Sequence, residues 1–163
     1  MTNETVTVSI EVAADPAIAF DVFTSEIDAW WLRGPKHRFK PPWNGCLRFE
    51  PGASGRLLEE YADGSSFVIG KVQQWKPGER LVLSWRLPVF AENETTEVDV
   101  RFEAIEGGTR VSVEHRGWHA LRADHPARHG LAGRDYEYMK AGLWAENLMA
   151  LRARLERGRV DRR

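Results

Sequence analysis

A chain of 163 residues, 42% hydrophobic and 29% charged, is long enough to fold around one core and to bury roughly 70% of the surface of the unfolded chain. Its formal net charge of -1 creates no field that favours nucleic acid or an anionic membrane surface, so we expect neither as a partner. No segment approaches the ~20 apolar residues that cross a bilayer, and the single cysteine, Cys46, excludes an intramolecular disulfide.

The N-terminal region contains one predicted strand and two predicted short helices. Residues 5–12 alternate between polar and apolar side chains, which is typical of a half-buried strand. Asp15 followed by Pro16 indicates the start of a helix, and Ser25 is a candidate N-cap for a second helix that ends at Trp31. Because no basic segment followed by an apolar run precedes the strand, we expect no signal peptide and a cytoplasmic protein.

The middle of the chain predicts a meander of six strands. A loop rich in proline and basic residues, 33–44, precedes them. The predicted strands are 46–50, 56–61, 67–75, 80–87, 94–104 and 109–118. Short turns such as Gly107-Gly108 separate them, and short turns join antiparallel neighbours because parallel neighbours need crossovers of about a dozen residues.

The C-terminal region predicts one long helix over residues 134–157. Its apolar side chains recur at spacings of three and four and form one stripe: Tyr138, Ala141, Trp144, Ala145, Leu148, Leu151 and Leu155. This helix is the only element long enough to cover the apolar face of the sheet. We therefore expect an α+β fold in which a curved antiparallel sheet of about seven strands surrounds the helix and leaves an internal cavity. One domain then spans residues 1–158, followed by a charged tail, 159–163.

Several segments, spread over nearly the whole chain, match a known pattern. They are VSIEVAADPAIAFDVF, the Trp30-Trp31 pair, GRLLEE before ADGS, GKVQQWKPGERLVLSWR, GGTRVSVEHRGW and the closing helix with Trp144. With the order of elements, they resemble the START-like (SRPBCC, helix-grip) superfamily of polyketide cyclases, aromatases and lipid carriers. They are most similar to its bacterial branch named after the activator of the heat-shock chaperone ATPase.

The resemblance implies a helix-grip fold and a hydrophobic small molecule as the ligand of the internal cavity. A cyclase- or dehydratase-like enzyme is one alternative, and a chaperone-interacting module that stimulates a chaperone ATPase is another. The eukaryotic activator has a separate N-terminal chaperone-binding domain, whereas this sequence begins at the first predicted strand. We therefore expect a small-molecule binding domain rather than an enzyme or an ATPase activator.

Strand parity predicts that two ionisable residues point into the interior. His115 shares a face with the apolar residues of the last strand, and Glu59 lies in the same phase as apolar residues of the second predicted strand of the meander. An interior carboxylate needs a partner, because burying it alone either costs about several kcal/mol or forces it to take up a proton. Glu59 and His115 are therefore a candidate acid/base pair. The alternatives are a hydrogen-bonded structural histidine and a salt bridge from Glu59 to Arg56 or Arg86.

Aromatic residues dominate the predicted cavity, because seven tryptophans are many for a chain of this length. Trp85 is in phase with the apolar side of its strand, Trp144 lies on the helical stripe, and Trp30 and Trp31 end the second short helix. The predicted ligand-binding residues are Trp30, Trp31, Leu57, Glu59, Tyr61, Trp85, His115, Tyr138 and Trp144. Such walls suit a flat hydrophobic ligand.

The sequence indicates neither a metal nor a cofactor. Two pairs of histidines are four residues apart, His115 with His119 and His125 with His129, but that spacing joins two ligands only within a helix. No phosphate-binding glycine loop, dinucleotide fingerprint or nucleophile elbow is present. A basic cluster, Lys36, His37, Arg38 and Lys40, is interpreted as a solvated loop, with an acidic ligand or partner as the alternative.

Overall fold

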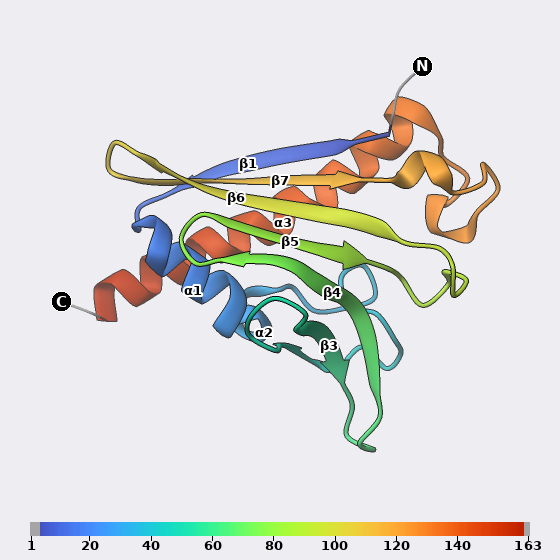
Figure 1. Ribbon diagram of the computed structural model, residues 1–163, viewed down its shortest axis with the longest axis horizontal. Helices are drawn as coiled ribbons and strands as arrows, with labels where there is room; N and C mark the ends of the chain where they lie inside the picture. The colour runs from blue at the N-terminus through green and yellow to red at the C-terminus, as the bar shows by residue number, and fades with distance from the viewer. Residues whose placement is uncertain (1–3, 162–163) are drawn as a thin grey trace.

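The computed structural model describes residues 4–161, with the side chains of 159–161 outside that description. Seven strands form one antiparallel sheet in the order β1-β7-β6-β5-β4-β3-β2, and the sheet curls around the C-terminal helix (Figure 1). The strands are β1 (Val6–Val12), β2 (Cys46–Phe49), β3 (Arg56–Glu60), β4 (Ser66–Lys76), β5 (Arg80–Trp85), β6 (Thr96–Ile105) and β7 (Gly108–Arg116). The predicted α+β helix-grip fold is confirmed, and each strand ends within two residues of its predicted limit.

The helices follow the predicted order. Asp15 caps α1 (Pro16–Ser25), because its Oδ1 accepts a hydrogen bond of 3.0 Å from the backbone N–H of Ile18. The predicted Ser25 cap of α2 (Ile27–Trp30) is wrong, because the Ser25 hydroxyl instead donates to the Asp21 carboxylate. The long helix α3 (Gly133–Asp161) outlasts its predicted end at residue 157, so part of the predicted charged tail is helical backbone, while residues 162–163 lie outside the described residues. Within residues 4–161, no helix is long and apolar enough to cross a membrane.

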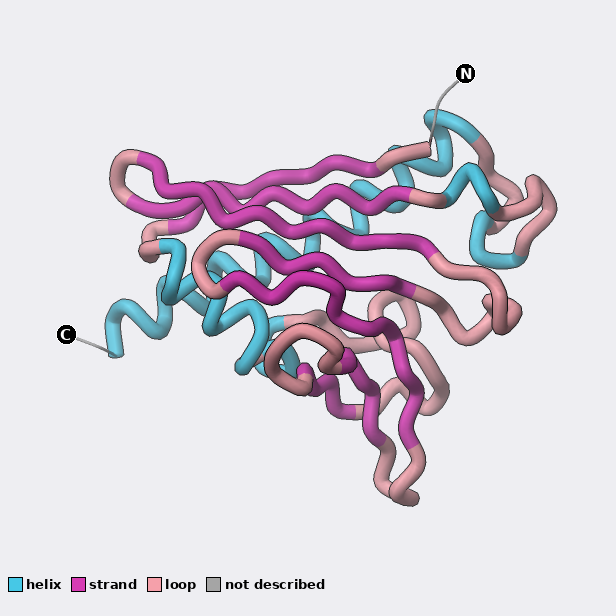
Figure 2. The backbone as a smooth tube through the Cα atoms, in the orientation of Figure 1, coloured by secondary structure: helices cyan, strands magenta, loops and turns pink. Residues whose placement is uncertain are grey.

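The sheet curls because β4 bends. Its pairing shifts register with β3 between Leu57 and Leu58 and with β5 between Val72 and Gln74. Such bulges bend a strand and increase its twist. At Gly70 a Cβ would lie 1.7 Å from the backbone oxygen of Ser84, so the close approach of the two strands requires glycine. Beyond the bend, β3 and β2 turn away from the plane of the other strands (Figure 2).

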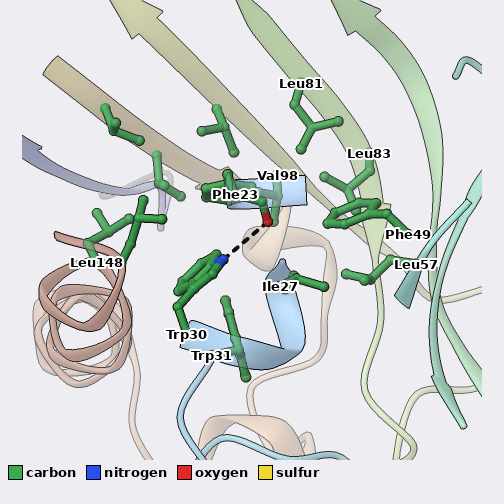
Figure 3. Packing of buried hydrophobic residues seen from close by; sticks show 14 of the residues in the cluster. Phe23, Ile27, Trp30, Trp31, Phe49, Leu57, Leu81, Leu83, Val98 and Leu148 are labelled. Carbon is green, nitrogen blue, oxygen red and sulfur yellow. Dashed lines mark hydrogen bonds between the residues drawn. The ribbon is translucent and has the colours of Figure 1, made fainter. Parts of the chain in front are cut away.

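The main core lies between the inner face of the sheet and α3. Figure 3 shows Leu148 of α3 facing side chains from the strands, with Ile27, Trp30 and Trp31 entering from α2 and the residue after it. The Trp30 indole is only 3% exposed and donates to the backbone oxygens of Val22 and Phe23 at the end of α1, each at 3.2 Å. Side chains from α1 and α2 therefore fill the space between the sheet and the C-terminal half of α3.

Two single-turn 3-10 helices, η1 (Trp118–Ala120) and η2 (Pro126–Arg128), lie between β7 and α3. This segment builds a second, smaller hydrophobic cluster with the start of α3: Phe90, Trp118, Leu121, Ala127 and Tyr136. Arg128 holds it in place, because its guanidinium donates to the Glu4 carboxylate and to the backbone oxygens of Trp118 and Leu121. The Arg128 hydrogen bond also lowers the pKa of Glu4. The smaller cluster thus fixes the segment that borders the N-terminal half of α3.

Candidate functional site

A pocket opens where the N-terminal half of α3 meets the loop after α2, the β5–β6 connection and η2. Its volume is ≈ 240 Å³. That lies between the ~150 Å³ cavity that holds benzene and the ~300 Å³ at which sites for drug-sized ligands begin. Its apolar lining consists mainly of Trp31, Phe39, Trp43, Trp85, Leu87, Pro88, Val89, Met139, Leu143 and Trp144. The pocket therefore has room for a small molecule of one or two rings.

Three tryptophans from three different elements form a continuous wall of this pocket. Trp31 follows α2, Trp85 ends β5 and Trp144 lies on α3. The ring centroids are 5.7 Å apart for Trp31 and Trp85, 5.3 Å for Trp31 and Trp144, and 5.5 Å for Trp85 and Trp144. All three side chains are buried, and their tilted and edge-on contacts are those that aromatic pairs prefer. The wall is rigid and presents apolar ring surface to the pocket.

His115 holds this wall from behind through a chain of hydrogen bonds. The Trp144 indole can only donate, so His115 Nδ1 accepts from it at 3.1 Å. The Thr96 hydroxyl donates to the backbone oxygen of Trp85 at 2.7 Å, which leaves His115 Nε2–H to donate to the Thr96 oxygen at 2.8 Å. Both ring nitrogens of this fully buried histidine are therefore engaged in the neutral state. Burial, and then the positive charge of Lys140, lowers the pKa of His115 well below its usual value.

Glu59 is also fully buried, as parity predicts, but neither predicted arginine is its partner. Its carboxylate accepts from the backbone N–H groups of Phe39 and Lys40, each at 3.1 Å, and from the Tyr61 hydroxyl at 2.6 Å. Burial and then the bond to Glu59 raise the pKa of Tyr61. At Gly45 a Cβ would lie 2.5 Å from Glu59 Cγ, so the backbone is packed directly against the carboxylate. Glu59 anchors the loop that forms one side of the pocket.

The predicted acid/base pair does not come together. Four strand spacings, from β7 to β3, separate His115 from Glu59, which is ~19 Å along the sheet. The two side chains share no hydrogen-bond partner, and neither lines the pocket. Acid/base catalysis by two groups requires both to reach one substrate. The geometry therefore gives this pair no common reacting centre.

The loop of residues 33–44 was predicted to be solvated, but part of it is buried. His37, Arg38 and Phe39 are all buried. Arg38 donates to the Asp28 carboxylate at 2.6 Å and to the backbone oxygens of Trp31, Leu32 and Gly45. The guanidinium can be buried because these acceptors satisfy its donors. Lys36 and Lys40, by contrast, are exposed.

A second set of bonds joins this loop to α3 through Asn147. Its Oδ1 accepts from the backbone N–H of Leu32 at 2.9 Å, and its Nδ2 donates to His37 Nδ1 at 3.1 Å. His37 Nε2 then faces the Glu146 carboxylate at 3.0 Å. Burial lowers the pKa of His37 although Glu146 opposes that change. The loop and α3 are thereby tied together across the pocket.

Four predicted ligand-binding residues besides Glu59 and His115 lie outside the pocket. Trp30 and Leu57 are core residues, and Tyr61 bonds to Glu59. Tyr138 is 85% exposed, and the buried tyrosine is Tyr136. Position 138 lies six residues before Trp144, so on a helix it points about 120° away from that residue. Tyr138 therefore lies off the buried stripe. Trp31, Trp85 and Trp144 are the predicted residues that line the pocket.

Sequence reasoning missed one basic residue of this site, Lys140. It lies one helical turn before Trp144, lines the pocket, and is partly buried. Its Nζ sits 5.2 Å from the ring centroid of Trp118. Burial lowers the pKa of Lys140 to about 8. The spacing of four residues from Trp144 was a signal that could have placed Lys140 on the same helical face.

A second hollow, ≈ 470 Å³, lies over α1, α2 and β2. It is more open to solvent than the pocket beside α3, and charged residues such as Asp28, Arg33 and Arg48 line much of it. Arg33 and Asp28 already form an ion pair there at 3.1 Å. Since apolar enclosure is what holds small ligands, the pocket beside α3 is the better candidate site.

The histidine pairs do not assemble a metal centre in the part of the chain that the structure describes, where no cluster of three or more His, Cys, Asp or Glu side chains could hold an ion. His125 is buried and bonds to Glu94 at 3.0 Å, whereas His129 is exposed beside the pocket.

Comparisons with solved structures support the fold. Protein MLL2253 from Mesorhizobium loti is 18% identical with a TM-score of 0.65, over 94% of this chain and 97% of that chain. The Aha1 dimer from Colwellia psychrerythraea is 17% identical with a TM-score of 0.62, over 93% and 96%. DynU16, a protein of the dynemicin biosynthetic locus, is 20% identical with a TM-score of 0.63, over 95% of this chain and 48% of its own.

No curated protein matches the chain. The family of Activator of Hsp90 ATPase homolog 1-like proteins matches it over residues 13–156, which runs from the residue after β1 to the last turns of α3. The match agrees with the fold, with the sheet order and with the bacterial branch that the sequence segments resemble. This chain therefore belongs to the Activator of Hsp90 ATPase homolog 1-like family.

Proposed function

We propose that this protein binds a small hydrophobic molecule in the pocket beside α3, in the cytoplasm, and performs no reaction on it. The observation that carries the proposal is the wall of Trp31, Trp85 and Trp144, which presents buried ring surface to a cavity of ≈ 240 Å³. Flat apolar ligands gain both burial and ring contacts on such a surface. The family supports a ligand-binding domain in general terms.

Two features favour binding over catalysis. His115 uses both ring nitrogens to hold Trp144 and Thr96, and Glu59 uses its carboxylate to hold the pocket loop. A general base must present a free lone pair to the substrate. A cyclase- or dehydratase-like role for this pair would require His115 to give up a hydrogen bond and both side chains to reach one substrate.

Family membership favours one further partner, a chaperone. The direct test is whether the purified chaperone binds to this chain.

The experiment is a titration with the two-ring dye 6-propionyl-2-dimethylaminonaphthalene, read from dye emission and from quenching of tryptophan emission. We expect saturable binding that the substitution Leu143→Trp abolishes, because a larger ring at a lining position fills the cavity. The matched control is Met149→Trp, on an exposed position of the same helix outside the pocket. Loss of binding in both variants, or in neither, would contradict a site in this pocket.

A further inference from the structure

The ionisable side chains that line the pocket are all basic. The ionisable residues that line it are Lys36, His37, Arg38, His129 and Lys140, and the lining contains neither aspartate nor glutamate. Arg38 is neutralised by Asp28 at 2.6 Å, and Lys36 by Glu146 at 3.3 Å, with both carboxylates outside the lining. The charge that remains available to a ligand is that of Lys140, at the end of the apolar wall.

Within residues 4–158, the ammonium group of Lys140 has no carboxylate partner, whereas a partly buried ammonium group ordinarily has one. Among the side chains of residues 4–158, no carboxylate oxygen lies within 4.0 Å of its Nζ, and its charged group instead faces the ring of Trp118. An ammonium without a counter-ion in an apolar surrounding is destabilised. Burial accordingly lowers its pKa to about 8. An anionic oxygen in the pocket would relieve this cost.

We propose that the ligand is an anion with a flat apolar body, in the simplest case a small aromatic carboxylate, whose carboxylate binds Lys140 Nζ. This inference rests on the proposed function and names the chemical class of its ligand. The body lies on the Trp31, Trp85 and Trp144 wall, and the charged group points toward α3. The lining contains no carboxylate that could pair with a cationic ligand of the same shape.

The binding of such a ligand depends on pH in a defined direction. An aromatic carboxylate is fully ionised above about pH 6, whereas Lys140 loses its charge as the pH rises through about 8. The other titratable or charged groups that line the pocket are Lys36, His37, Arg38 and His129. Lys140 also acts on His37 and, behind the wall, on His115 through its positive charge. Burial lowers the pKa of both His37 and His115, so neither gains charge in this range. Affinity therefore falls between about pH 7 and pH 9.5.

The test compares two probes of one shape, naphthalene-2-carboxylate and naphthalene-2-carboxamide, by isothermal titration calorimetry on the full chain. We expect the carboxylate to bind on the order of tenfold more tightly than the amide, because a charge-assisted hydrogen bond forms only with the former. Lys140→Met should remove that preference and the pH dependence. Lys140→Arg should keep the preference.

The matched control is Lys71→Met, which makes the same change of net charge at an exposed position of β4 outside the pocket. It should bind both probes as the parent does. Equal affinity of the parent for both probes, or a preference that survives in Lys140→Met, would overturn the inference and leave the proposed function standing. Binding of neither probe would overturn both.

Discussion

The two halves of α3 differ in what they contact, and the difference separates the fold from the site. In the C-terminal half, Leu148, Leu151 and Leu155 are 2% exposed or less and pack under the sheet beside α1. In the N-terminal half, Lys140 and Leu143 are partly exposed and face the pocket. The same helix thus closes the core at one end and forms a wall of a ligand site at the other.

The largest expected effect tests whether stability resides in the C-terminal half. Leu151→Ala should lower the free energy of unfolding by ~2–5 kcal/mol, because it leaves a cavity in a well-packed core. Leu143→Ala, the same change at a partly exposed pocket position, should cost less than about 1 kcal/mol. Urea denaturation of both variants measures the difference. Equal losses would mean that the pocket end is as much a part of the core as the other end.

A smaller effect is expected at the junction between the sheet and the pocket loop. Glu59→Gln should lower the free energy of unfolding by about 1–3 kcal/mol, because an amide cannot accept all the donors that the carboxylate holds. The variant should also weaken probe binding, since Phe39 lines the pocket and is held by Glu59. Glu60→Gln, on the exposed ion pair of the neighbouring residue, is the control. Unchanged stability of the Glu59→Gln variant would show that contacts other than those to Glu59 hold the pocket loop in place.

The smallest expected effect is the contribution of His115 to the pH dependence of the free energy of unfolding. Its pKa in the folded protein lies below the unfolded value, so the unfolded chain binds more protons as the pH falls below about 6.5. Stability should therefore fall between pH 6.5 and 5 by up to ~1.4 kcal/mol per pH unit for this group. His37 contributes in the same direction. Denaturation at several pH values should give a shallower slope for His115→Asn than for the parent, and identical slopes would mean that His115 is not held neutral.

The fold could be predicted from sequence because its signals are local. Alternation along residues 5–12 and turn residues such as Gly107-Gly108 define strands without knowledge of their neighbours, and parity alone placed Glu59 and His115 inside. The position of Tyr138 was wrong because a spacing of three, repeated, drifts around the helix.

The site was harder to predict because its contacts join distant segments. Glu59 is bonded to the loop residues 19 and 20 positions before it, and Asn147 is bonded to Leu32 across 115 positions. Lys140 resembles any solvated lysine until the fold sets Trp118 beside it. The absence of acidic residues from the pocket lining is a property of four separate segments together, and no single stretch of sequence displays it.

A ligand site at the open end of α3 can be detected through the seven tryptophan indole N–H signals in a nitrogen-15 NMR spectrum, titrated with naphthalene-2-carboxylate. We expect shifts for the indoles of Trp31, Trp85 and Trp144, with saturation at a single site. The indole of Trp75, which packs against Phe20 and Phe49 away from the pocket, should stay unchanged. A spectrum in which the Trp75 signal shifts while those of the three wall tryptophans do not would rule out a ligand site in this pocket.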